Sequence, residues 1–122
     1  MISFVQLNGM KSQAAIDLLQ ATARRKRLDV IMLSEPNIGT ANDQSWSVDA
    51  RQGSCVKSLS QVHMVKGRGH GNNFAWIEYE RCIMCSCYFP PGKPIMEFEE
   101  SLEELAAFRR NCRKGIITGG DF

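Results

Sequence analysis

The chain has 122 residues, of which 43% are hydrophobic and 23% are charged. This composition is typical of a globular protein and excludes a disordered or collagen-like chain. Fifteen Lys and Arg against thirteen Asp and Glu leave a formal net charge of +2, so any binding to nucleic acid must come from a local patch of cations. The length predicts one folding unit, or part of one.

Cysteine usage and hydropathy indicate the compartment. No apolar run approaches the roughly 18–20 residues of a membrane helix, and Met1–Val5 lacks the features of a signal peptide. The five cysteines are an odd number, and three of them lie close together at positions 82, 85 and 87. Because a disulfide framework needs paired cysteines, we expect reduced thiols and an intracellular protein.

The first part of the chain predicts a strand, a helix and a second strand. Ile2–Leu7 is short and apolar, and it ends at the turn dipeptide Asn8-Gly9. Apolar residues then recur at helical spacing up to the basic run Arg24–Arg27, which complements the negative end of the helix dipole. Leu28–Leu33 is nearly all apolar, as in a strand buried on both faces. We expect a right-handed βαβ unit with Glu35 directly after its second strand.

The middle of the chain predicts a meander of short strands. Residues that point to opposite faces of a strand alternate with a period of two, and this pattern is clearest in the two segments joined by Glu80-Arg81. The expected strands are Trp46–Asp49, Ser54–Ser58, Gln61–Val65, Phe74–Tyr79 and Cys82–Phe89. The glycine-rich segment Gly67–Gly71 is interpreted as a flexible hairpin tip rather than a phosphate-binding loop, because no helix follows it.

A second helix and a last strand follow. The helix carries Phe98, Leu102 and Leu105 on one face, with glutamates in its first half and cations in its last turns. Gly115–Thr118 is a short strand that continues into Gly119–Phe122. Because no element follows to cover this strand, we expect the chain to end within a domain.

Polar residues lie just past the carboxyl ends of four predicted strands: Asn8, Glu35, Tyr88 and Asp121. Ligands of open α/β sheets bind at this end of the strands. If the strands are neighbours, the four side chains form one cluster of two carboxylates, an amide and a phenol. Such a cluster suits Mg²⁺, which prefers oxygen ligands and keeps several waters. The metal would polarise a phosphoryl oxygen and stabilise a leaving oxyanion.

Four ordered motifs resemble those of the endonuclease/exonuclease/phosphatase superfamily, which includes the deoxyribonuclease-I-like folds. They are Leu7-Asn8, Ser34-Glu35-Pro36, Ser86–Pro91 and Gly119–Phe122. Together with the hairpin around Trp46, Asp49 and Gly53, they are most similar to the endonuclease domains of non-LTR (LINE-type) retrotransposon polyproteins. These polyproteins also carry an RNA-directed DNA polymerase. The similarity extends over essentially the whole chain.

The resemblance implies an α/β (α+β) fold, a partial four-layered α/β sandwich with mixed β-sheets flanked by helices. It implies Mg²⁺- or Mn²⁺-dependent hydrolysis of the DNA phosphodiester backbone, in the nucleus for a functional retroelement. By position, Glu35 would be the main metal ligand and Asn8 would assist at the metal or the scissile phosphate. Tyr88 would donate a hydrogen bond to the phosphate or its leaving group, and Asp121 would orient or deprotonate the attacking water.

The chain departs from the family pattern at its end. The family continues the Gly-Asp-Phe motif with an asparagine, further strands and an Asp–His pair, whereas His63 and His70 lie in the middle meander. We therefore expect residues 1–122 to be the N-terminal portion of one such domain, truncated after Gly-Asp-Phe and inactive alone. The missing strands would leave an unpaired edge that favours association.

Structural interpretations of the same site residues stay open. Glu35 would cap the turn at Pro36, Asn8 and Asp121 would serve turns, and Tyr88 would pack as an ordinary strand aromatic. For the whole chain, the alternatives are another phosphoesterase of the superfamily, of phosphatase or sphingomyelinase type, and a non-catalytic fragment.

Other motifs have structural interpretations as well. Cys82, Cys85 and Cys87 suit zinc with His63 or His70, but in a strand Cys82 points away from the other two thiols, which favours buried free thiols. Arg68 and His70 lie on the glycine-rich segment that is interpreted as a hairpin tip. The alternative interpretation is that these two side chains contact a nucleic-acid backbone. The basic run Arg24–Arg27 is interpreted as a solvated helix end rather than as a nuclear localisation patch.

Overall fold

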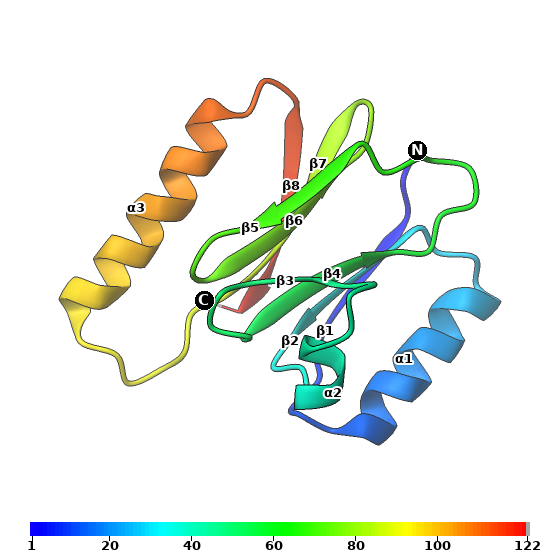
Figure 1. Cartoon of the computed structure of the whole chain (residues 1–122), viewed down its shortest axis with the longest axis horizontal. Helices are drawn as coiled ribbons and strands as arrows, with labels where there is room; N and C mark the ends of the chain where they lie inside the picture. The colour runs from blue at the N-terminus through cyan, green and yellow to red at the C-terminus, as the bar shows by residue number, and fades with distance from the viewer. Residues whose placement is uncertain (122) are drawn as a thin grey trace.

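Two four-stranded sheets form the centre of the molecule in a computed structural model, which describes residues 1–121 and only the backbone of Asp121 (Figure 1). The first sheet has the order β1-β2-β4-β3 and the second the order β5-β6-β7-β8. The strands of the first sheet are β1 (Phe4–Asn8), β2 (Val30–Ser34), β3 (Ser47–Val48) and β4 (Ser54–Ser58). Those of the second are β5 (Gly67–His70), β6 (Phe74–Glu78), β7 (Cys82–Tyr88) and β8 (Gly115–Asp121).

Both sheets are mixed, because each contains one parallel pair that is connected through a helix. Helix α1 (Gln13–Arg25) connects the parallel strands β1 and β2, and helix α3 (Ile95–Asn111) connects the parallel strands β7 and β8. The other strand pairs are antiparallel. A single helical turn, α2 (Ile38–Ala41), follows β2.

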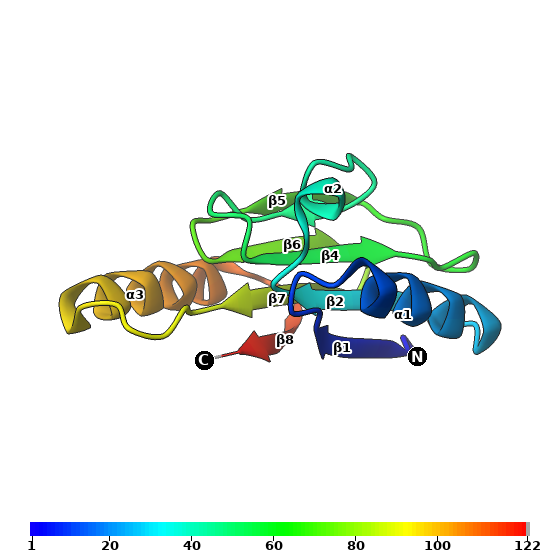
Figure 2. The same cartoon turned by 90° about the horizontal axis from the view of Figure 1, so that it is seen from below.

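The layers follow the order α1, first sheet, second sheet, α3 (Figures 1 and 2). In β2 all residues are buried, and their side chains alternate: Ile31 and Leu33 pack with α1, whereas Val30 and Met32 pack against the second sheet. This is the period-two pattern of a strand between two apolar layers. The fold class expected from the resemblance, an α/β sandwich with mixed sheets and flanking helices, is confirmed.

The second sheet has the same two-faced construction. Met84 of β7 packs between the sheets, whereas Cys85 and Cys87 pack against α3 together with Leu105. Cys82 belongs to the intersheet side, so the predicted separation of Cys82 from the other two thiols is confirmed. Burial raises the pKa of the Cys85 thiol, which favours its protonated form.

Most predicted elements lie within a few residues of their expected positions, and the ends of α1 show why. Its N-cap residue Ser12 accepts a hydrogen bond from the Ala15 N–H at 3.2 Å, and Arg24 and Arg25 occupy its last turn. Side-chain capping and terminal cations are the signals that begin and end a helix. No helix in the described part of the chain has the length and apolar character that a membrane-spanning helix needs.

The prediction for the segment between β4 and β6 is wrong. Gln61–Val65 is not a strand, and Gly67–His70 is β5, paired antiparallel with β6, rather than a hairpin tip. The glycines of β5 serve close packing: a Cβ on Gly69 would lie 2.6 Å from Cζ2 of Trp76. The glycine-rich composition therefore reflects an aromatic side chain lying against the strand, and not flexibility.

Candidate active site

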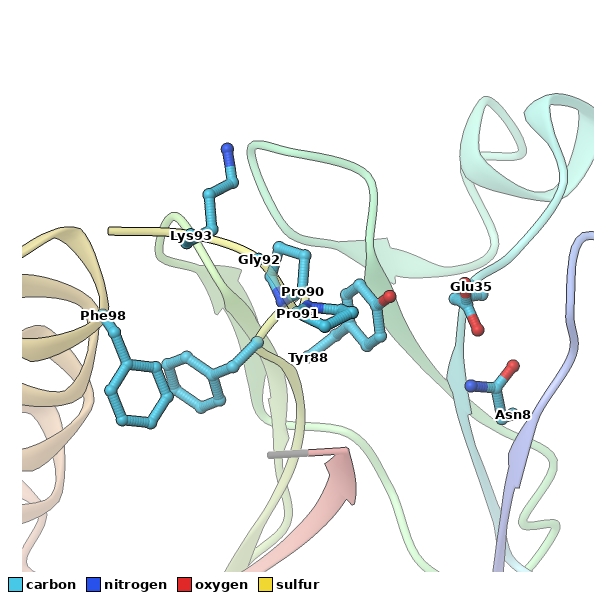
Figure 3. Close-up of a pocket in the computed structure, with 9 residues that line it drawn as sticks. Asn8, Glu35, Tyr88, Pro90, Pro91, Gly92, Lys93 and Phe98 are labelled. Atoms are coloured by element: carbon cyan, nitrogen blue, oxygen red, sulfur yellow. The ribbon is translucent and has the colours of Figure 1, made fainter. Parts of the chain in front are cut away.

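Three of the residues expected at the site line one cavity at the carboxyl ends of the parallel strands (Figure 3). Asn8 ends β1, Glu35 follows β2 and Tyr88 ends β7, so two side chains come from the first sheet and one from the second. The cavity has a volume of about 570 Å³. The loop from Phe89 to Lys93 and Phe98 of α3 complete its lining.

The backbone of Asp121 ends β8 directly opposite Tyr88 in the register of the parallel pair. Nearby, Gly119 approaches the first sheet so closely that a Cβ would lie 3.0 Å from Cε of Met32. The end of β8 therefore lies at the same end of the sandwich as the other strand ends. The side chain of Asp121, and with it this part of the predicted site, lies outside the described residues.

Glu35 is half-buried and has a left-handed backbone conformation, with φ of 51°. This conformation costs a residue with a Cβ roughly 1–2 kcal/mol. Two hydrogen bonds hold it: the Glu35 N–H donates to the Gly53 carbonyl at 2.8 Å, and the Glu35 carbonyl accepts from the Lys11 N–H at 2.8 Å. The turn thus holds the backbone of Glu35, and the carboxylate points toward Asn8 (Figure 3).

Asn8 serves a turn and lies at the cavity at the same time. Its Oδ1 accepts a hydrogen bond from the Met10 N–H at 2.8 Å, an interaction typical of asparagine in turns. The following Gly9 is buried, and its N–H donates to the Ser34 carbonyl at 2.8 Å, which joins the turn to β2. Asn8 therefore serves the turn after β1, and its side chain lines the cavity as well.

The backbone of Tyr88 is held by Asn73, and its ring is held by Gly53. Its N–H donates to the Asn73 carbonyl at 3.0 Å, and the Asn73 side-chain Nδ2 donates to the Tyr88 carbonyl at 3.2 Å. The ring packs on Gly53, where a Cβ would lie 2.8 Å from Cδ2 of Tyr88. The phenol oxygen is turned toward Glu35 and Asn8 (Figure 3). Gly53 thus contacts both halves of the site, because its carbonyl also binds Glu35.

A buried carboxylate, Asp49, supports the turn that carries Gly53. Its Oδ1 accepts from the Gly53 N–H at 2.9 Å and its Oδ2 accepts from the Ser54 hydroxyl at 2.5 Å. Asp49 is only 3% exposed. Burial raises its pKa above the usual aspartate range, and the hydrogen bonds from Ser54 and Gly53 oppose this effect.

Sequence reasoning missed a second group of residues at the site. A further cavity of about 350 Å³ shares Glu35 and Tyr88 with the first and is also lined by Lys11, Arg51 and Lys93, and by Asp49 and Asn73. The cations come from three separate loops, so no spacing along the chain relates them. Asp49 did have a sequence signal, because it belongs to the Trp46, Asp49 and Gly53 hairpin of the family resemblance, but that motif assigned it no role at the site.

The donor set of the first cavity fits a hard divalent cation. Glu35 supplies a carboxylate and Asn8 an amide oxygen, and Mg²⁺ typically binds one or two carboxylates and several waters. Among the side chains that the structure describes, no three His, Cys, Asp or Glu residues form a closed metal cage.

Comparison with known structures agrees with this architecture. The chain is similar in fold to the endonuclease domain of TRAS1, a telomere-specific non-LTR retrotransposon, with a TM-score of 0.76 and 18% sequence identity. The match covers 98% of this chain and 58% of the TRAS1 chain. No protein-family model and no curated protein matches the sequence. The chain therefore has the fold of this endonuclease domain, as the sequence motifs predicted.

Proposed function

We propose that the chain carries the metal-binding part of a DNA-nicking endonuclease of a retrotransposon, and that residues 1–122 are the N-terminal portion of that domain. The observation that carries the proposal is the convergence of Asn8, Glu35 and Tyr88 from three strand ends into one cavity, in a fold shared with a retrotransposon endonuclease domain. The alternative phosphatase and sphingomyelinase types are not favoured by that comparison.

Each residue has a role that its chemistry supports. Glu35 would hold Mg²⁺ or Mn²⁺ with the assistance of Asn8, and the bound cation would supply charge to stabilise the phosphate and the leaving oxygen. Tyr88, whose phenol faces these residues, would donate a hydrogen bond to the phosphate. Asp121 would accept the proton of the water whose oxygen bonds to phosphorus, while the bond to the 3′ oxygen breaks.

Metal binding tests the proposal without requiring turnover. Mn²⁺ titrated into the protein should broaden the amide NMR signals of Asn8, Glu35 and Tyr88 before those of other residues. Glu35→Gln keeps the shape of the side chain but removes its charge, so it should weaken Mn²⁺ binding by about tenfold or more. The control Glu99→Gln removes the same charge from an exposed position on α3 and should leave binding unchanged.

Nicking of supercoiled plasmid completes the test. We expect residues 1–122 to bind the cation without nicking, because the resemblance places further catalytic groups beyond Phe122. Nicking that depends on Glu35 would support the catalytic role and contradict the expected incompleteness. Failure of Mn²⁺ to reach Glu35, together with no nicking, would overturn the proposal.

A further inference from the structure

The cations that sequence reasoning missed form a continuous surface beside the candidate site. Lys11 lies in the loop before α1, Arg51 in the turn between β3 and β4, and Lys93 in the loop before α3. All three side chains line the cavity that contains Glu35 and Tyr88. Lys11 and Arg51 also line a neighbouring cavity of about 590 Å³ that extends beside α2.

The positions of these cations depend on the same backbone contacts that hold the site. The Lys11 N–H binds the Glu35 carbonyl at 2.8 Å, and Arg51 lies in the turn that Asp49 closes through the Gly53 N–H at 2.9 Å. Lys93 follows Tyr88 by a short proline-rich loop, from which it extends outward (Figure 3). The backbone positions of Lys11 and Arg51 are therefore held relative to Glu35 and Tyr88, and Lys93 is tied to Tyr88 by the short loop between them.

Their charges are available to an external anion. Within the described residues, neither Lys11 nor Arg51 forms an ion pair, and both are exposed. Lys93 pairs with Glu97 at 3.9 Å, with both side chains nearly half exposed. Such a surface pair contributes only about 0–1 kcal/mol, so a phosphate can replace the carboxylate. Asp49, the other carboxylate of this cavity, is buried and occupied by its own hydrogen bonds.

The opposite flank of the site has the opposite charge. The first half of α3 carries five glutamates: Glu97, Glu99, Glu100, Glu103 and Glu104. Lys93 is the one of the three cations that lines the first cavity beside Phe98 of α3, and Arg51 and Lys93 both line a small neighbouring cavity with Glu97, whereas Lys11 lines neither cavity with a residue of α3. A polyanion is therefore attracted toward Lys11, Arg51 and α2, and repelled from α3.

We propose that Lys11, Arg51 and Lys93 form a DNA-backbone track that binds the phosphates next to the scissile one and leads the strand away from the site on the α2 side. The inference rests on the proposed function, since it takes the phosphate at Glu35 and Tyr88 as the reacting one. It adds the residues that hold the substrate and the direction in which the strand leaves. Phosphate contacts of this kind fix the register of DNA without reading its sequence.

Binding of a fluorescein-labelled DNA duplex, measured by anisotropy in EDTA, tests the track separately from metal binding and cleavage. Lys11→Gln, Arg51→Gln and Lys93→Gln should each weaken binding about three- to tenfold. Each should also lower the slope of log Kd against log salt concentration by about 1, because one fewer counterion is released. Glu97→Gln frees Lys93 and should strengthen binding.

Lys26→Gln is the matched control. It removes one exposed positive charge from within the basic run Arg24–Arg27, at the C-terminal end of α1 and at the other end of the first sheet. This variant should keep the wild-type affinity and salt slope. Equal losses in Lys26→Gln, or unchanged slopes in the three track variants, would overturn the proposal. If these three cations bind DNA in a protein that fails to bind Mn²⁺, the phosphate-binding track is retained, whereas the proposed function, and with it the reacting phosphate at Glu35, is rejected.

Discussion

At the scale of single residues, Asp49 is the support on which the site depends. Its carboxylate accepts hydrogen bonds from the Gly53 N–H and the Ser54 hydroxyl, both next to the turn that contacts Glu35 and Tyr88. Leaving a buried donor without a partner costs about 1–3 kcal/mol. We expect Asp49→Ala to lower the free energy of unfolding by that amount in urea titration.

Asp17 provides the comparison for Asp49. It is an exposed carboxylate on α1 whose hydrogen bond partner, Gln13, is exposed as well. Asp17→Ala should change the free energy of unfolding by less than about 0.5 kcal/mol. Equal effects of the two substitutions would show that the buried hydrogen bonds of Asp49 contribute nothing to stability.

Asp29 predicts how stability depends on pH. Burial acts to raise its pKa, but hydrogen bonds from Ser3 and Ser60 and the nearby His63 outweigh this effect and leave the pKa below the usual aspartate value. Since the folded state binds this proton less readily than the unfolded state, Asp29 stabilises the fold above the unfolded pKa. This contribution is lost as the pH falls through the folded pKa.

The variant Asp29→Asn measures this contribution. Its free energy of unfolding should fall less steeply than that of the wild type when the pH is lowered from about 5 toward 3. Urea titrations over this pH series provide the comparison. Parallel curves for the two proteins would contradict the assigned role of Asp29.

At the scale of elements, β5 shows how glycine can indicate packing. A Cβ on Gly69 would lie 2.6 Å from Trp76, whereas a Cβ on Gly115, at the start of β8, meets nothing within 4 Å. We expect Gly69→Ala to destabilise the protein by about 1–3 kcal/mol through overpacking. Gly115→Ala should be neutral or slightly stabilising. Thermal unfolding of the two variants checks this difference.

Some helices and strands could be predicted from the sequence, and others could not. Strands β2 and β7 were predictable because each is apolar on both faces. Helix α1 was predictable because its apolar residues recur at helical spacing between an N-cap residue and two terminal cations. β5 was not, because the Trp76 ring that requires its glycines comes from the neighbouring strand. The single turn α2, with its N-cap bond between Asn37 and Thr40, is too short to show a period.

The residues of the candidate site also divide into those that local sequence predicts and those that only the tertiary structure brings together. The positions of Asn8, Glu35 and Tyr88 were predictable because each ends or directly follows a recognisable strand. Lys11, Arg51 and Lys93 were not, because their proximity depends on how three loops fold over the strand ends. Side chains fixed by a strand end can be inferred from local sequence, whereas charges brought together by loops require the tertiary structure.

At the scale of the whole molecule, β1 and β8 lie beside each other as outer strands of their sheets (Figure 2). Within the described residues each pairs on one side only, and Phe4, Leu7 and Ile117 are at least 37% exposed. Open strand edges with apolar side chains favour pairing between molecules. We expect self-association that increases with protein concentration, measured by sedimentation velocity.

A charge on this edge should reduce that association. Ile117→Lys places a cation on β8, a substitution that is typical of protected edge strands. Val62→Lys adds the same charge to the exposed segment between β4 and β5, where Val62 is 85% exposed, and should leave association unchanged. Equal effects of the two variants would indicate a general charge effect instead of edge pairing.

Tyr88 packs on Gly53 across the boundary between the two sheets, and this contact has a consequence for synthesis on the ribosome. When the first sheet has emerged, the nascent chain has Asn8 and Glu35 but no phenol to face them. The tyrosine arrives only after β6 and β7 have been made and have docked. A growing polypeptide is therefore unable to bring these three side chains together until the second sheet has docked on the first.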